Sequence, residues 1–183
     1  LRKGEMLALQ WSDIDFENST VSVTKAAAVV DGKQVCKAPK TKNSRREVSI
    51  PRFLTDRLHN LMVEQTKNKE SLGAYWKGNN WLFTQSDGSM MSYSTPYATF
   101  QDAIDRYNAD KEPADQLPHI PFHGLRHTSA TLLIAAHQDV RTVSNRLGHA
   151  QASTTMNIYA HALKENDRTA SNALENMLCK TGA

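Results

Sequence analysis

Alternating hydrophobic and polar positions predict strands in the first third of the chain. Residues 20–24 read TVSVT, and the valines that follow lead to an Asp-Gly pair at Asp31, a dipeptide typical of two-residue hairpin turns. Val48 and Ile50 alternate in another short strand, which ends at Pro51 because proline cannot donate to a strand ladder. The pattern therefore predicts a small antiparallel sheet of about three strands near the N-terminus.

The rest of the chain has apolar residues at helical spacing. Residues 1–11 fit the end of a helix and residues 53–62 fit a second one, after which a polar stretch over 67–80 predicts a linker. Another helix is expected to begin near Thr95, because a proline follows in its first turn. From His123 onward the pattern indicates successive helices, with breaks at HQD, at LGHAQ and near AHALKEN. The predicted fold class is α+β, mainly α.

Composition narrows the class of protein without identifying it. A chain of 183 residues with 39% hydrophobic residues is long enough for one domain with a real core. The net charge of +3 is compatible with a nucleic-acid partner, but many basic enzymes share it. The two cysteines lie far apart, which argues against a disulfide framework or a zinc finger and favours a reducing, intracellular setting. A run of roughly 18 apolar residues, as a membrane span needs, does not occur.

The segment PFHGLRHTSATLL (121–133) places His123 and Arg126 on one face of an expected helix start. Arginine offers a planar fork of donors that suits phosphate oxygens, and a nearby histidine can transfer protons near neutral pH. The nearest acidic residues are Asp115 and Asp139, so the anion that this pair would bind has to come from elsewhere. A helix-start histidine beside an outward-pointing arginine has the same spacing, and the motif alone does not separate the two.

Three further features carry candidate chemistry. Half of residues 37–46 are Lys or Arg, with no acidic residue among them. A turn with this charge could bind a polyanion, but a basic loop that is only exposed to solvent has the same composition. In RLGHAQASTTMNIYAH, Gly148 fits a left-handed helix cap, His149 follows it, and Tyr159 lies on the next expected helix, where a core position is equally reasonable. Arg2, in LRKGE, is another cation that needs a partner.

Taken in order, four segments resemble the catalytic domain of the tyrosine recombinases, the phage integrase family. The family pattern is an arginine in R-x-G-E, a lysine in a β-hairpin, H-x-x-R, and L-G-H followed nine or ten residues later by a tyrosine. This chain reads LRKGEMLALQWSDID, PKTKNSRREVSIP, FHGLRHTSATLL and LGHAQASTTMNIYAH. Each motif alone is weak, whereas four in the family order are specific. The resemblance covers nearly the whole chain and is greatest to integrases of Gram-positive phages and of integrative and conjugative transposons.

The resemblance implies a role for each of five residues. Arg2 and Arg126 match the two catalytic arginines of the family, and Tyr159 matches the nucleophile. His123 matches the histidine of H-x-x-R and is the expected general base, while His149 matches the histidine of L-G-H and is expected to hydrogen-bond the phosphate. These five side chains are therefore predicted to converge on one phosphate group.

The hairpin lysine of the family has two candidates. Lys40 is our first choice as the general acid and Lys42 is the rival, because the segment between Arg2 and the hairpin is longer than in compact members. Lys42, Arg45 and Arg46 are expected to contact the DNA backbone. The catalytic set that the resemblance implies is Arg2, Lys40, His123, Arg126, His149 and Tyr159.

The implied activity is site-specific DNA recombination. Tyr159 would attack a DNA phosphate, form a 3′-phosphotyrosyl link, and release a 5′-hydroxyl; a hydroxyl of a partner duplex would then reverse the step. One phosphodiester replaces another, so no ATP is expected, and two arginines can do the work that a metal ion does at other phosphoryl-transfer sites. Strand cleavage and rejoining without exchange, as in a type IB topoisomerase, is the alternative function.

The same resemblance implies the partners and the setting. Double-stranded DNA is the expected partner, with a homotetramer of the full-length protein on DNA and with directionality or DNA-bending factors. We expect no cofactor, no metal and no membrane, and a cytoplasmic location on DNA in a bacterial cell. Residues 1–183 are taken as a single tyrosine-recombinase catalytic domain, with DNA-binding domains expected upstream of Leu1.

Several assignments stay open at the level of sequence. His127 fits helix packing as well as proton transfer, and Trp81 fits the core as well as a place beside the active site. Residues 168–180 fit a helix folded on its own core as well as one docked on a neighbouring protomer. The remaining histidines are taken as structural: His59, His119, His137 and His161.

Overall fold

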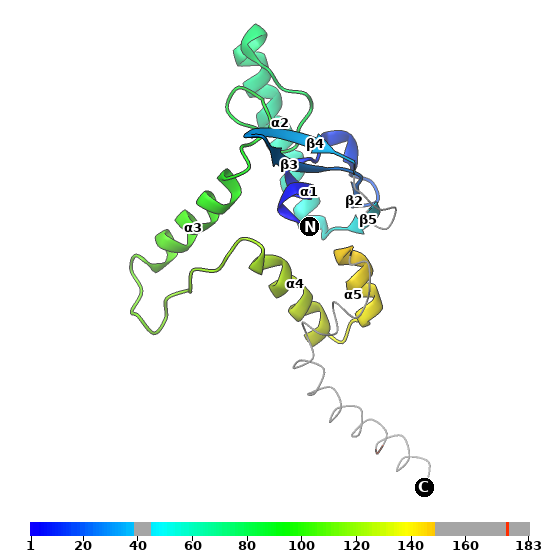
Figure 1. Ribbon diagram of the computed structural model, residues 1–183, viewed down its shortest axis with the longest axis vertical. Helices are drawn as coiled ribbons and strands as arrows, with labels where there is room; N and C mark the ends of the chain where they lie inside the picture. Colours follow the sequence, from blue (N-terminus) through cyan, green and yellow to red (C-terminus); the bar gives the residue numbers. More distant parts are fainter. Residues whose placement is uncertain (39–44, 149–174, 176–183) are drawn as a thin grey trace. The chain divides into compact units, whose positions relative to one another are not determined.

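The computed structural model describes residues 1–38, 45–148 and 175. The described residues fall into two compact units, Leu1–Arg126 and a second unit that begins at His127, and each is described by itself. In the first unit, a short helix is followed along the chain by five strands, which form two small antiparallel sheets, and then by two longer helices (Figure 1). This element order confirms the predicted α+β class with its sheet near the N-terminus.

Helix α1 (Lys3–Leu7) is short and packs against strand β3 (Ala26–Val30), as Figure 1 shows. Gly4 permits this contact. A Cβ atom at that position would lie 2.3 Å from the carbonyl oxygen of Ala27, which is closer than a side chain can come to a backbone oxygen. The glycine therefore lets the first turn of α1 approach the β3 backbone directly, and it fixes the position of the residues on either side of it.

The described strands form two antiparallel sheets. They are β1 (Ile14–Asp15), β2 (Thr20–Val23), β3 (Ala26–Val30), β4 (Lys33–Lys37) and β5 (Arg46–Ser49). The order β1-β2-β5 makes the predicted three-stranded sheet, whereas β3 and β4 pair only with each other in a separate ribbon. Asp31 and Gly32 turn this ribbon with φ angles of 49° and 73°, as the Asp-Gly pair predicted.

Helix α2 (Arg52–Leu72) is longer than the hydrophobic pattern predicted. The linker expected over 67–80 is wrong in its first part, because the helix continues to Leu72 and ends at Gly73, whose φ is 51°. Lysine and glutamate favour the helical backbone even where no apolar face continues, so periodicity alone ends the helix too early. Among the described residues, no helix is both long and apolar enough to cross a membrane.

The segment after α2 returns to the N-terminal part of the chain before the next helix. Residues 81–84 form isolated antiparallel bridges, in which Trp81 pairs with Gln10 and Thr84 pairs with Met90. Helix α3 (Thr95–Asn108) begins where it was predicted, with a proline in its first turn. The bridge to Gln10 ties this segment to the residues that follow α1.

Two hydrophobic clusters form the core of the first unit as far as its residues are described. The larger one joins the start of the chain to the three-stranded sheet and α2 through Leu9, Ile14, Val21, Leu58 and Leu82. The smaller one joins α1 to the ribbon through Leu7, Ala8 and Ala27, with Tyr93 among the residues packed against it. Helix α1 is thus held by buried apolar contacts, and its N-terminal turn carries the polar residues described below.

Helix α4 (Gly124–Ala135) starts in the first unit, and α5 (Val140–Leu147) belongs to the second. The Oδ2 atom of Asp139 accepts a hydrogen bond from the backbone N–H of Thr142 at 2.8 Å, which caps the start of α5. Gly148 ends α5 in the left-handed conformation, with φ 67°, which confirms the predicted breaks at HQD and LGHAQ; the break predicted near AHALKEN lies outside the described residues. The described core of this unit consists of Ala130, Ile134, Val143 and Leu147.

Candidate active site

Glu5 holds Arg2 at the N-terminal turn of α1. The backbone N–H of Arg2 donates to Oε2 of Glu5 at 2.7 Å, and Nη1 of the Arg2 guanidinium donates to Oε1 at 2.9 Å. Three residues separate the two positions, so the helical turn itself brings them together. The Arg2 side chain is 42% exposed, whereas that of Glu5 is only 6% exposed. The carboxylate is therefore an internal anchor for a guanidinium that reaches the surface.

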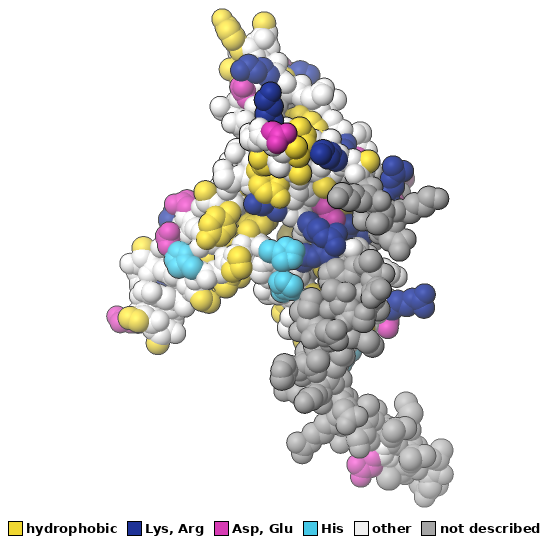
Figure 2. Space-filling model, viewed as in Figure 1, with side chains coloured by type: hydrophobic (Ala, Val, Ile, Leu, Met, Phe, Trp, Pro, Cys, Tyr) yellow, Lys and Arg dark blue, Asp and Glu magenta, His cyan; other side chains and the backbone are white. Residues whose placement is uncertain are grey.

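Arg46 binds the same carboxylate from strand β5. Its Nη1 donates to Oε1 of Glu5 at 3.1 Å and its Nη2 donates to Oε2 at 2.8 Å, which is the two-pronged geometry that favours arginine over lysine. The Arg46 side chain is 8% exposed. We expected this residue to contact DNA from the basic loop, but it lies inside the molecule in an ion pair. In Figure 2, Lys and Arg side chains gather around an acidic one in this part of the molecule.

The surroundings of Glu5 keep it ionised. Burial by itself would raise the pKa of its carboxyl group, because the charged form loses water. The hydrogen bonds and positive charge of Arg46, together with the hydrogen bonds from Arg2, outweigh burial and lower the pKa from 4.5 to about 2. Glu5 is therefore a permanent negative charge at neutral pH, and the cluster of two arginines and one glutamate has one positive charge in excess.

Arg2 and His123 line one cavity although they are far apart in the sequence. The cavity has a volume of about 840 Å³ and also includes Glu5 and the aromatic side chains of Tyr93 and Phe122 in its wall. His123 precedes α4, and its carbonyl oxygen accepts the backbone N–H of Arg126 at 3.1 Å. A predicted catalytic arginine and the predicted general base thus face the same space.

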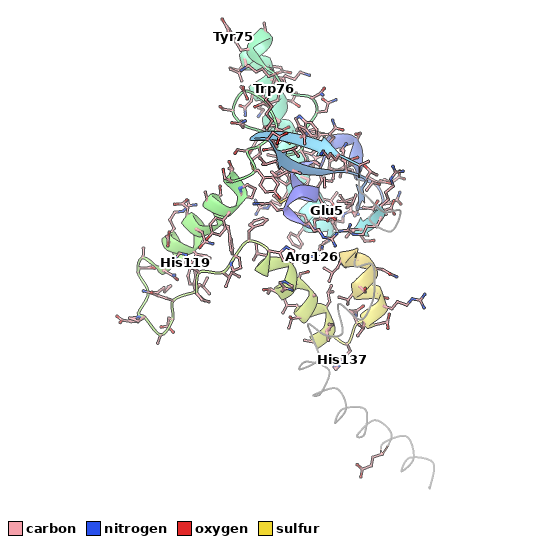
Figure 3. All side chains as sticks on the ribbon, viewed as in Figure 1. Glu5, Tyr75, Trp76, His119, Arg126 and His137 are labelled. Carbon is pink, nitrogen blue, oxygen red and sulfur yellow. The ribbon has the colours of Figure 1, made fainter. Side chains whose placement is uncertain are left out.

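Arg126 lies in the first turn of α4 and is 6% exposed. Burial of an arginine requires hydrogen-bonding or charged partners, because the guanidinium stays protonated. Figure 3 labels Arg126 on α4 and Glu5 on α1. The helix start at Gly124 that positions Arg126 agrees with the sequence pattern, which expected His123 and Arg126 one turn apart.

Four predicted site residues, three of them in the catalytic set, lie outside the described residues. They are Lys40, Lys42, His149 and Tyr159, and their assignments stay predictions. Arg45 is described and is exposed, one residue before β5 begins. Of the proposed backbone contacts, Arg45 is thus accessible to a polyanion, in contrast to its neighbour Arg46.

Two of the histidines taken as structural have partners in the fold. The ring of His59 meets Phe16 edge-on at 6.0 Å between ring centres. Nε2 of His119 lies 3.1 Å from a carboxylate oxygen of Asp105, and its Nδ1 contacts Gln101. Neither histidine is among the residues that line the cavity with Arg2 and His123. Among the described residues, no group of three or more His, Cys, Asp or Glu side chains is arranged to hold a metal ion.

The sequence model of the phage integrase family matches residues 1–166. The chain belongs to the phage integrase family. This family member is 32% identical over 189 residues to a tyrosine recombinase XerC-like protein of Caldanaerobacter subterraneus subsp. tengcongensis, covering 97% of the chain and 46% of that relative. It is 33% identical over 180 residues to the ICEBs1 integrase of Bacillus subtilis, again covering 97% and 46%. The chain thus spans about half the length of the curated relatives it matches.

Solved structures establish the fold of this family member. It superposes on the Tn1549 transposon integrase, solved in complex with transposon right-end DNA, with a TM-score of 0.78 at 24% identity, covering 96% of this chain and 55% of that one. The XerA recombinase gives a TM-score of 0.66 at 23% identity, covering 92% and 53%. The predicted catalytic-domain fold of the tyrosine recombinases is therefore confirmed.

Glu5 was not among the site residues predicted from the sequence. The signal was present, because LRKGE places an acid three residues after Arg2, at the spacing of one helical turn. Its second partner, Arg46, could not be found in this way, since it lies 41 residues further along the chain.

Proposed function

We propose that this phage integrase family member is the catalytic domain of a site-specific DNA recombinase. The observation that carries the proposal is the cavity that Arg2 and His123 line together, with Glu5 holding the guanidinium of Arg2. The site thus combines a cation suited to a phosphate with a group that can accept a proton. Family membership supplies the reaction class, since curated relatives bear the names recombinase, integrase and transposase. Those names favour strand exchange over topoisomerase activity.

In the proposed reaction, Arg2 and Arg126 neutralise the non-bridging oxygens of the scissile phosphate. The phosphodiester is anionic and repels an incoming oxygen nucleophile, and negative charge on its oxygens builds up further in the transition state. Donors that are already in place at that point lower the barrier without having to reorganise. Removing one such donor typically costs about 3 kcal/mol in the barrier. Two arginines supply this charge from the protein itself, so the proposed reaction uses neither a metal ion nor ATP.

Proton transfer accompanies the exchange of bonds. The phenol oxygen of Tyr159 forms a bond to phosphorus while the bond between phosphorus and the 5′-oxygen breaks. A tyrosine has a pKa of about 10, so its proton has to be accepted at neutral pH, and His123 takes it as general base. Lys40, or its rival Lys42, gives a proton to the departing 5′-oxygen, and His149 hydrogen-bonds the phosphate. The reverse sequence, with a hydroxyl from a partner duplex, releases Tyr159.

The proposed partner is double-stranded DNA, whose backbone Lys42 and Arg45 contact. Exposed cations of this kind release counterions when they bind phosphates, so binding should weaken as salt rises. Exchange between two duplexes requires more than one active site, and we propose a homotetramer on DNA for the full-length protein, assisted by directionality or DNA-bending factors. This work takes place on DNA inside the bacterial cell.

A covalent trap with randomised DNA tests the proposed function and selects the target sequence at the same time. The probe is a duplex library with randomised arms and a nick a few nucleotides beyond the centre, so that the short 5′-hydroxyl fragment diffuses away after cleavage. Covalent adducts of the chain are recovered under denaturing conditions and sequenced, and the enriched sequence becomes the defined substrate. The measurement is made in EDTA without ATP, and with the Tyr159→Phe variant as control.

We expect wild type to accumulate a covalent adduct in EDTA, and Tyr159→Phe to bind the enriched DNA without forming one. Transfer of the bound strand to a second labelled duplex is expected from a recombinase. No adduct with wild type, an adduct that needs Mg²⁺, or an adduct that persists in Tyr159→Phe would contradict the proposal.

A further inference from the structure

We propose that Arg46 is a positioning residue for the cleavage step, which acts through Glu5 to hold the guanidinium of Arg2 in place with its charge available to the phosphate. This inference rests on the proposed function and deepens it. It also replaces the expectation that Arg46 contacts DNA, and it gives this buried arginine a role that the reaction requires.

Hydrogen bonds to the Glu5 carboxylate connect Arg46 to Arg2. Each oxygen of the Glu5 carboxylate accepts two hydrogen bonds, one from Arg2 and one from Arg46, at 2.7 to 3.1 Å. Arg46 binds with both prongs of its guanidinium, so the carboxylate plane is fixed relative to strand β5. Arg2 in turn binds that carboxylate through its backbone and its side chain. The orientation of Arg2 is therefore set by a rigid strand through one shared carboxylate.

Burial separates the roles of the two arginines. The side chains of Arg46 and Glu5 are 8% and 6% exposed, whereas that of Arg2 is 42% exposed. A phosphate that enters the cavity can meet Arg2, which lines it together with His123. Arg46 is better placed to act on the carboxylate behind Arg2 than on the DNA itself.

The net charge of the cluster formed by Arg2, Glu5 and Arg46 also depends on Arg46. Glu5 has one negative charge, and without Arg46 it would form a neutral pair with Arg2 before any phosphate arrived. With Arg46 bound to both carboxylate oxygens, the three residues keep one net positive charge, which matches the single negative charge of a phosphodiester. The charges of Glu5 and Arg46 compensate each other in a site that is largely shielded from water, and the positive charge that remains lies on the exposed guanidinium of Arg2. Arg46 thus offsets the very carboxylate that orients Arg2.

Adjacent arginines provide a matched test. Arg46→Met removes the buried cation and keeps much of the side-chain volume, while Arg45→Met removes the exposed cation one position earlier. Both variants are compared with wild type for DNA affinity at several salt concentrations and for the single-turnover rate of adduct formation at saturating DNA. The probe is the enriched nicked duplex from the covalent trap.

We expect Arg46→Met to slow adduct formation on the order of 10- to 100-fold, somewhat less than the loss of a direct donor, with DNA affinity changed less than about threefold. Arg45→Met is expected to show the opposite pattern, with weaker binding, a smaller salt slope and a rate at saturation within about threefold of wild type. Arg46→Lys keeps the charge but loses the two-pronged contact, and it should recover part of the rate.

A substrate with an uncharged group at the cleavage position distinguishes the loss of a correctly placed positive charge from general damage to the fold. A methylphosphonate at the cleavage position has no negative charge to neutralise, so the rate ratio between wild type and Arg46→Met should fall toward one. Damage to the fold would slow both substrates alike. If Arg46→Met does not fold, as urea unfolding would reveal, the same comparison is made with Arg46→Lys.

The outcomes distinguish the two proposals. If wild type forms no adduct at Tyr159, the proposed function fails and this inference fails with it. If wild type reacts and Arg46→Met reacts equally fast, binds DNA as weakly as Arg45→Met does, or keeps its full defect on the methylphosphonate, Arg46 is not a positioning residue and the proposed function stands.

Discussion

Replacing Glu5 by glutamine tests whether the carboxylate is the charged anchor that the structure indicates. Glutamine keeps the shape of the side chain, but it removes the negative charge between two guanidinium groups and turns one acceptor into a donor. Arg46, with a side chain only 8% exposed, would then face a neutral amide. Breaking a buried ion pair in this way typically destabilises a protein by about 3–5 kcal/mol.

The pKa of Glu5 gives a second way to obtain the contribution of the ionised carboxylate to stability. Burial would raise that pKa, yet the two arginines lower it from 4.5 to about 2. Each pKa unit corresponds to about 1.4 kcal/mol, so the ionised carboxylate contributes about 3 kcal/mol at pH 7. Because the folded-state pKa is the lower one, this contribution is complete above the unfolded-state pKa and is lost as the pH falls toward 2. By pH 3 it should be less than half of its value at pH 7.

The assay is urea unfolding of wild type and Glu5→Gln, followed by tryptophan fluorescence between pH 7 and pH 3. All three tryptophans, Trp11, Trp76 and Trp81, lie in the same compact unit as Glu5, so the signal reports on the relevant part of the chain. Glu47→Gln, on the same strand as Arg46 but exposed, serves as the control for loss of one acidic charge.

We expect Glu5→Gln to lose about 3 kcal/mol at pH 7 and the difference from wild type to shrink by about 2 kcal/mol at pH 3. Other acidic groups titrate alike in both proteins and cancel in the difference. Glu47→Gln should change stability by less than about 0.5 kcal/mol. A Glu5→Gln difference that stays constant with pH, or that matches the control, would refute the charged-anchor reasoning.

Two further predictions concern backbone features around the site and in the second unit. Gly4→Ala should destabilise the first unit by about 1–3 kcal/mol and slow adduct formation, because the added Cβ would displace α1 from the Ala27 carbonyl. Unfolding followed by tryptophan fluorescence and single-turnover rates of adduct formation measure the two effects. If stability and rate are both unchanged, α1 does not need its close approach to β3. Asp139→Ala should cost about 1 kcal/mol through loss of the α5 cap, measured by urea unfolding with circular dichroism, whereas Asp139→Asn should retain most of it.

Local chemistry explains the parts of the fold that the sequence predicted well. The Asp31–Gly32 turn, the proline in the first turn of α3 and the left-handed cap at Gly148 each depend on a few adjacent residues whose backbone preferences are strong. These features were predicted because no distant contact has to be known. The extension of α2 to Leu72 was missed for a related reason, since apolar periodicity says little about a solvated helix end.

Long-range pairing explains what could not be predicted. The pattern predicted strands, but it did not show that β3 and β4 form a ribbon apart from the β1-β2-β5 sheet. Arg46 looked like one of several cations in a basic loop, because its partner Glu5 is remote in sequence. The site residues Arg2 and His123 were predicted from the resemblance to the family, and the structure brings both to one cavity. The catalytic roles of all six residues of the predicted catalytic set stay predictions, and Lys40, His149 and Tyr159 also lie outside the described residues.

Mapping the residue that becomes linked to DNA tests the central claim most directly. Trypsin cleavage after Arg146 and Lys164 yields one peptide, LGHAQASTTMNIYAHALK, in which Tyr159 is the only tyrosine. After reaction with the nicked duplex and nuclease digestion, mass spectrometry should find the residual nucleotide on this peptide and fragment ions should assign it to Tyr159. A nucleotide on another residue, or on another peptide, would contradict the account.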